Sequence, residues 1–130
     1  MRLLVSESIT ATLLYGTSNL VIQKIQRVQN AAARFLMGTL KYEHNTPVLQ
    51  SLHWLPVPYR IEYKILLITF KALNGMAPNY LQELLTLYEP SRALRSTDNK
   101  LLRVPKTRLK TYGDRAFYAL APKLWNLLPV

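Results

Sequence analysis

The stretch from residue 52 to residue 74 constrains the fold more than any other part of this chain. Pro56 and Pro58 fit the first turn of a helix, where a missing backbone N–H costs nothing, and Gly75 can adopt the left-handed conformation that ends one. Between these marks the apolar residues form two adjacent seams, one of Ile61, Ile65, Ile68 and Ala72 and the other of Tyr59, Tyr63, Leu66, Phe70 and Leu73. Because so wide an apolar face needs burial on two sides, we predict a central core helix at about residues 58–74.

An apolar repeat before this stretch predicts a second long helix, over residues 20–37. Its apolar positions recur at intervals of four and three residues, at Val21, Ile25, Val28, Ala32 and Phe35. Ser18 or Asn19 can cap the N-terminus of this helix, and Gly38 can end it. We interpret the repeat as the packing face of an amphipathic helix, because a coiled coil needs three or four heptads and this repeat spans about two.

Two shorter helices are predicted on either side of the central one. The pair Thr46-Pro47 places a capping residue before a proline at the first helical position, and this helix reaches about residue 52. The pair Ala77-Pro78 begins the other, whose apolar positions continue at helical spacing as far as Tyr88. We expect Val48, Leu49 and Leu52 of the first of these helices to pack on the central helix.

The last third of the chain lacks the regular apolar spacing of the first two thirds. Residues 91–100 have no apolar period and read as a charged loop, and residues 100–104 predict a short extended segment because Pro105 disfavours a helical conformation at Val104. Gly113-Asp114 can cap a final helix that contains Phe117 and Leu120. We expect Pro122 to begin a new turn after that helix.

Charge divides the chain in the same place. Residues 1–90 hold eight Lys/Arg against five Glu, a net charge of +3, whereas residues 91–130 hold nine Lys/Arg against two Asp, a net charge of +7. A chain of 130 residues fits one domain. We therefore predict a mostly α fold, a small multi-helix bundle in which residues 1–90 form the helical core. Residues 91–130 form a basic, partly irregular C-terminal third of the same domain, with a loop and short C-terminal helices.

Composition argues against several classes of protein. The chain has no cysteine, which excludes a thiol site. It has two aspartates, far apart in the sequence, so no acidic dyad can be assigned, and its four glycines are isolated, so no glycine-rich phosphate loop can be assigned. His44 and His53 lack a third metal ligand nearby, and exposure in loops explains them more simply. We predict no catalytic activity, no metal and no cofactor. No apolar run is long enough for a membrane span, which favours an intracellular protein of the nucleus or cytoplasm that is not secreted.

The basic third offers a candidate site for nucleic acid. Its cations are interleaved with aromatic residues, and phosphate-binding cations beside stacking rings are what single-stranded nucleic acid requires. The candidate residues are Arg103, Lys106, Arg108, Lys110, Arg115 and Tyr112. The alternative is that the aromatic residues belong to the core and the cations to a solvated rim. RNA or single-stranded DNA is the expected partner, and a membrane is not.

Blocks of residues spread over nearly the whole chain resemble the region after the reverse transcriptase core in non-LTR, LINE-like retrotransposon polyproteins. The order of the blocks is more specific than any one of them. They are Leu13-Leu-Tyr-Gly16, residues 25–34, Ser51-Leu-His-Trp-Leu-Pro-Val57, Arg60-Ile61, residues 63–67, Phe70-Lys-Ala-Leu-Asn-Gly75, Ala77-Pro78, Tyr80-Leu81, Leu94-Arg-Ser96, Tyr112-Gly-Asp-Arg-Ala-Phe117 and Pro122-Lys-Leu-Trp-Asn126.

This resemblance implies a non-catalytic C-terminal accessory domain of a reverse transcriptase that holds template RNA or target DNA. The family's aromatic-x-Asp-Asp metal turn has no counterpart here, so no catalytic residue can be transferred. Residues 8–12 also depart from the family, whose members show an Asp-Tyr-Cys-Asn-like run at that place. A second interpretation stays open: a helical interaction or scaffold module that docks on the upstream polymerase, or a decayed transposon fragment without activity.

Overall fold

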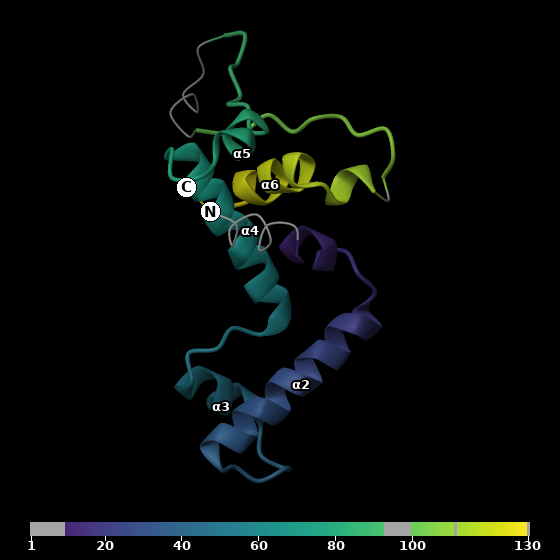
Figure 1. Ribbon diagram of the computed structural model, residues 1–130, viewed down its shortest axis with the longest axis vertical. Helices are drawn as coiled ribbons and strands as arrows, with labels where there is room; N and C mark the ends of the chain where they lie inside the picture. The colour runs from purple at the N-terminus through teal and green to yellow at the C-terminus, as the bar shows by residue number, and fades with distance from the viewer. Residues whose placement is uncertain (1–9, 93–99, 111, 130) are drawn as a thin grey trace.

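The computed structural model describes residues 10–92, 100–110 and 112–129, and it is mostly helical, as the sequence predicts (Figure 1). Residues 10–14 form a helical turn, and a 3-10 turn, η2, precedes the last helix. The described elements are α2 (Asn19–Met37), α3 (Asn45–Ser51), α4 (Val57–Leu73), α5 (Asn79–Glu83), η2 (Gly113–Arg115) and α6 (Phe117–Asn126). No described helix is both long and apolar enough to cross a membrane.

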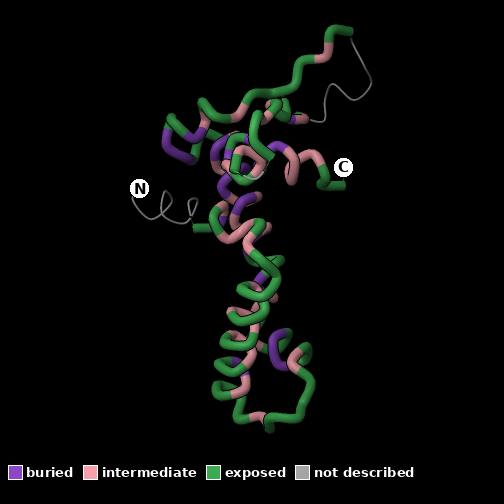
Figure 2. Tube along the Cα trace, turned by 90° about the vertical axis from the view of Figure 1, so that its right-hand side faces the viewer, coloured by how far each residue is buried: buried purple, intermediate pink, exposed green. Residues whose placement is uncertain are grey.

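The helices form an arm and a body. In Figure 1, α2 and α3 lie side by side in the lower half as the arm, and α4 rises from the arm into the body, where it meets α5 and α6. Figure 2 shows that buried residues gather in the body, whereas most of the arm is exposed. The apolar core is correspondingly split into a large cluster around α4 and α6 and a small one between α2 and α3.

Packing of α4 against α6 forms the large cluster. Ile65 and Ile68 of α4 are fully buried, and α6 contributes Phe117, Leu120 and Ala121 to the same cluster. The buried hydroxyl of Thr69 donates a hydrogen bond to the carbonyl oxygen of Ile65 at 2.8 Å. The first predicted seam is therefore the core face of the central helix.

The expectation that both seams of α4 are buried is wrong. Among the residues of the second seam, Tyr59, Tyr63 and Phe70 are exposed, and Leu66 and Leu73 are half-buried. The reason is geometric: α6 covers one side of α4, and no described element covers the aromatic residues on the other. The sequence correctly predicted the bounds of this helix, because Pro58 lies in its first turn and Gly75 follows it with φ 70°.

The bounds of α2 are confirmed, but of its predicted packing face only Ile25 packs against the core. Gly38 ends α2 in the left-handed conformation with φ 62°. The buried residue of α2 is Ala33, which packs against Val48 and Leu49 of α3, whereas Val28 and Phe35 of the predicted face are exposed. Apolar spacing shows that a helix has an apolar face, but the small Ala33 decides where α3 can approach.

Two glutamine side chains join the arm to the start of α4. The Oε1 atom of Gln26 accepts a hydrogen bond from the backbone N–H of Val57 at 2.7 Å. Three residues further along α2, the Nε2 atom of Gln29 donates to the carbonyl oxygen of Leu55 at 2.8 Å. These polar contacts fix the elbow between α3 and α4 on the surface of α2.

Three predictions about the shorter helices need correction. Val48 and Leu49 of α3, expected on the central helix, are buried against Ala33 of α2 instead. The helix after Pro78 ends at Glu83 rather than near Tyr88, because the chain beyond it turns extended and pairs with residues 101–103. Pro122 does not begin a new turn but lies inside α6, where its ring is fully buried. A proline inside a helix removes one backbone hydrogen bond, and burial of the ring in the core offsets that loss.

We expect Ile65→Ala to lower the free energy of unfolding by about 2–5 kcal/mol, because it opens a cavity in the contact between α4 and α6. Urea denaturation followed by circular dichroism measures the change. The matched control is Tyr63→Ala on the exposed side of the same helix, which should stay within about 0.5 kcal/mol of the unsubstituted chain. Equal losses from both substitutions would contradict this account of the core.

Candidate nucleic-acid interface

Residues 101–103 form the extended segment that the sequence predicts, and they are held from both sides. Leu102 makes an antiparallel bridge with Leu87, in which the N–H of Arg103 donates to the carbonyl oxygen of Thr86 and the N–H of Tyr88 donates to that of Leu101, both at 2.8 Å. The bridge positions the backbone of Arg103 at the surface of the body.

The Asn126 side chain holds the other side of this segment. Its Oδ1 atom accepts from the N–H of Leu102 at 2.9 Å, and its Nδ2 atom donates to the carbonyl oxygen of Leu102 at 2.8 Å. One amide therefore satisfies both backbone groups of a residue whose side chain is buried. Because Asn126 is the last residue of α6, this contact ties the basic segment directly to the core helix.

Beyond the extended segment, two cations and a ring surround a surface hollow of about 610 Å³. Arg103 and Lys106 lie on its rim, and Tyr118 of α6, which is 37% exposed, contributes an aromatic surface. Leu84 and Thr86 line the opposite side. The hollow thus offers a stacking face beside two positive charges.

The next residues form a loop, 107–114, that is closed at its base. Thr107 donates a hydrogen bond to the Asp114 carboxylate, and the Lys123 Nζ atom lies 3.2 Å from the same oxygen. Gly113 permits this closure, because a Cβ atom there would lie 2.9 Å from the Cβ atom of Thr107. Between these ends, Arg108, Leu109, Lys110 and Tyr112 are exposed.

The contacts that close the loop also lower the pKa of the Asp114 carboxyl. The hydrogen bond from Thr107, followed by the hydrogen bond and positive charge of Lys123, lowers the pKa of the Asp114 carboxyl below its usual value. Lys110 contributes to the same shift through its charge. Asp114 therefore stays ionised at neutral pH and holds the base of the loop together.

The structure brings most of the predicted site residues into one continuous surface segment. Arg103 and Lys106 share the hollow, while Arg108, Lys110 and Tyr112 share the loop. Arg115 lies slightly apart, beside Gly16, where a Cβ atom would come within 2.9 Å of its Nε atom. All six side chains are exposed, and Tyr112 is 76% exposed.

The alternative interpretation, a core of aromatic residues with a solvated basic rim, holds for only part of the segment. Phe117 is buried in the core and Trp125 is half-buried, whereas Tyr112 and Tyr118 are exposed beside cations. The sequence pattern includes Tyr118 among the aromatic residues interleaved with the cations, but it did not indicate that Tyr118 lines the hollow with Arg103 and Lys106. It missed Asn126 as the anchor, because this residue acts on Leu102, 24 positions away, and leaves no local spacing.

Compared with protein-family models, with curated proteins and with solved structures, the chain matches none of them. The resemblance to LINE-like polyproteins therefore stays a prediction. In the described part of the chain, no three His, Cys, Asp or Glu side chains lie close enough to hold a metal ion.

We expect Asn126→Ala to lower the free energy of unfolding by about 1–3 kcal/mol, because both backbone groups of Leu102 lose their partner. Hydrogen exchange should show faster exchange at the Leu102 amide, and urea denaturation should show the loss of stability. The matched control is Gln23→Ala, which removes an exposed amide from α2 and should leave both measurements unchanged. Unchanged exchange at Leu102 in the Asn126 variant would contradict the assigned role.

We also expect the stabilising effect of Asp114 to depend on pH. Its pKa is lower in the folded chain than in the unfolded one, so its contribution to stability is present at neutral pH and is lost as the pH falls through the folded value. Thr107→Val and Lys123→Met should each raise the Asp114 pKa toward its usual value. Carboxyl carbon NMR titration measures both shifts, and an unchanged pKa in Thr107→Val would count against this closure of the loop.

Proposed function

We propose that this chain is a non-catalytic accessory region of a LINE-like reverse transcriptase and binds single-stranded nucleic acid through residues 103–118. The observation that carries this proposal is the exposure of five cations, Arg103, Lys106, Arg108, Lys110 and Arg115, and of two rings, Tyr112 and Tyr118, within that segment. Template RNA is the first candidate ligand, and target DNA is the second. The upstream polymerase would supply all catalysis, and the chain would act inside the cell, in the nucleus or cytoplasm.

The charges of the segment are available to a ligand. Between described residues, Lys123 and Asp114 form the one salt bridge, which leaves Arg103, Lys106 and Arg108 without a carboxylate partner in that part of the chain, while Lys110 acts on Asp114 only through its charge. An extended backbone advances roughly 3.3 Å per residue, so cations two or three positions apart are spaced roughly 7–10 Å. Such a row can follow the phosphates of a flexible single strand.

The rings supply the second half of the binding site. Tyr118 lies beside Arg103 and Lys106, so a base stacked on this ring would place its phosphate near the two cations. Tyr112 stands in the loop with Arg108 and Lys110 and offers the same combination. Stacking contributes roughly 1–3 kcal/mol per base and tolerates any sequence. The expected binding is therefore electrostatic, stacking-assisted and weakly dependent on sequence.

Fluorescence anisotropy tests the proposal with a labelled oligouridine of about 15 nucleotides. This length is enough to span the cations of the basic segment. Affinity should fall steeply between about 50 and 200 mM salt, because bound phosphates release their counterions. Replacing Lys106, Arg108 and Lys110 together with Ala should flatten the plot of log affinity against log salt by about 2, since each phosphate contact in a single strand contributes about 0.7.

The matched control removes three exposed cations from the arm, Lys24, Arg27 and Lys41. It lowers the net charge equally, so it should leave the slope nearly unchanged if binding is confined to the basic segment. Equal flattening by both triple variants would show attraction to net charge rather than to a site. No measurable binding at about 50 mM salt would overturn the proposal.

A further inference from the structure

The arm leaves an apolar face of α2 without a partner in the described part of the chain. Val28 is 70% exposed and Phe35 is 87% exposed, and Val21 and Ala32 lie on the same face and are exposed as well. Together with half-buried Ile25, these five residues recur at the spacing of a face that packs on another helix. We call these five residues the α2 stripe.

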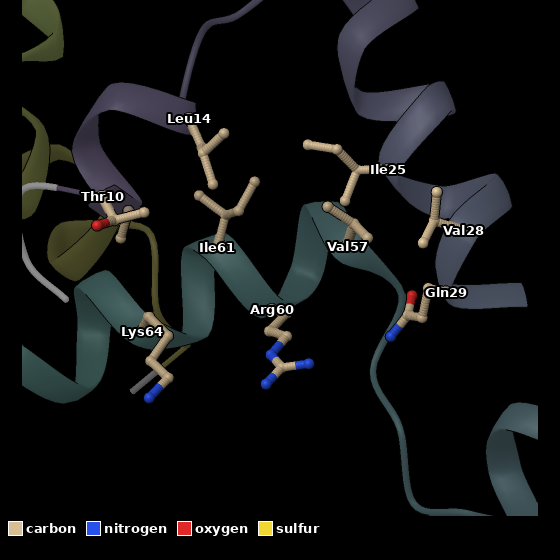
Figure 3. Close-up of a pocket in the computed structure, with 10 residues that line it drawn as sticks. Thr10, Leu14, Ile25, Val28, Gln29, Val57, Arg60, Ile61 and Lys64 are labelled. Atoms are coloured by element: carbon tan, nitrogen blue, oxygen red, sulfur yellow. The ribbon is translucent and has the colours of Figure 1, made fainter. Parts of the chain in front are cut away.

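A hollow of about 470 Å³ continues the α2 stripe toward α4. Figure 3 shows its apolar floor, where Leu14 points toward Ile61 of α4 and Ile25 of α2 faces Val57. Ile25 and Val28 belong both to the stripe and to the hollow. The two features therefore form one apolar surface that runs from the body onto the arm.

The charges around this surface are positive. The helix α2 carries Lys24, Arg27 and Arg34 and no acidic residue. On the other side of the hollow, Arg60 of α4 lines the rim and points away from the apolar floor (Figure 3). A second copy of the chain would bring these cations against their equivalents, which is unfavourable. A partner that binds this surface should therefore carry negative charges beside its apolar residues.

We propose that this surface binds an amphipathic helix of a partner protein that carries acidic residues beside its apolar seam. The α2 stripe extends over 15 residues, from Val21 to Phe35, so at about 1.5 Å per residue it matches a partner helix of roughly four turns. Apolar side chains at helical spacing would cover the stripe and enter the hollow, and flanking carboxylates would face Lys24, which neighbours Ile25 of the stripe. This mode is helix-in-groove recognition, and it is separate from the nucleic-acid interface.

Three labelled peptides of about 18 residues, long enough for five helical turns, test the proposal by fluorescence anisotropy on the full chain. The first has leucines at positions i, i+3, i+4 and i+7 with glutamates beside them. The second has the same leucines with lysines in place of the glutamates. The third has the composition of the first in a scrambled order. The first peptide should bind at least about tenfold more tightly than either of the others.

Substitutions in the α2 stripe then test whether the acidic peptide binds there. Val28→Asp combined with Phe35→Asp should weaken binding of the acidic peptide at least about tenfold, because it places charge in the apolar seam. Both positions are exposed, so the variant keeps its fold, which circular dichroism checks. The matched control is Leu127→Asp combined with Met76→Asp, two exposed apolar positions of the body. It should bind the acidic peptide as the unsubstituted chain does.

Four outcomes would overturn the proposal. The first is equal affinity for the acidic and basic peptides, and the second is equal loss of affinity in both double variants. The third is a dimer in sedimentation that the Val28/Phe35 variant no longer forms. The fourth is binding to vesicles with about 30% phosphatidylserine without binding to the acidic peptide. The third would show that two copies cover the surface, and the fourth would show that a lipid surface does. Oligouridine binding by the Val28/Phe35 variant should remain unchanged, which separates this proposal from the proposed function.

Discussion

Close packing of α4 on α6 is the constraint on which the rest of the structure depends. Ile65 and Ile68 of α4 and Phe117, Leu120 and Ala121 of α6 are buried in one cluster, from which close packing excludes water. Burial of these side chains supplies the favourable free energy that a chain with a net charge of +10 needs against its own repulsion. The described cations are mostly at the surface, where water screens them.

The same helix that completes the core also organises the basic surface. Tyr118 lines the hollow, Lys123 closes the loop through Asp114, and Asn126 holds the backbone of Leu102. These three residues lie on α6, whose position is set by its contact with α4. The irregular backbone of the basic segment is therefore held in place by side chains of a single helix, α6.

The sequence predicts what depends on local chemistry. Pro58 and Gly75 mark the bounds of α4, and Gly38 marks the end of α2, because each residue restricts or permits particular backbone angles. Periodicity also identified the face of α4 that is buried. It could not identify the buried face of α2, because that face is selected by the fit of Ala33 to α3. The contact of Asn126 with Leu102 spans 24 positions and leaves no local pattern.

The glutamine contacts at the elbow have a mechanical consequence. The angle at which α4 leaves the arm rests on the amide groups of Gln26 and Gln29 and on apolar packing of Ile25 beside the buried Val57. A hydrogen bond that can be exchanged for one to water has a net value of only about 0.5–1.5 kcal/mol. Loss of either amide would therefore weaken this joint only slightly, because the apolar contact beside it remains.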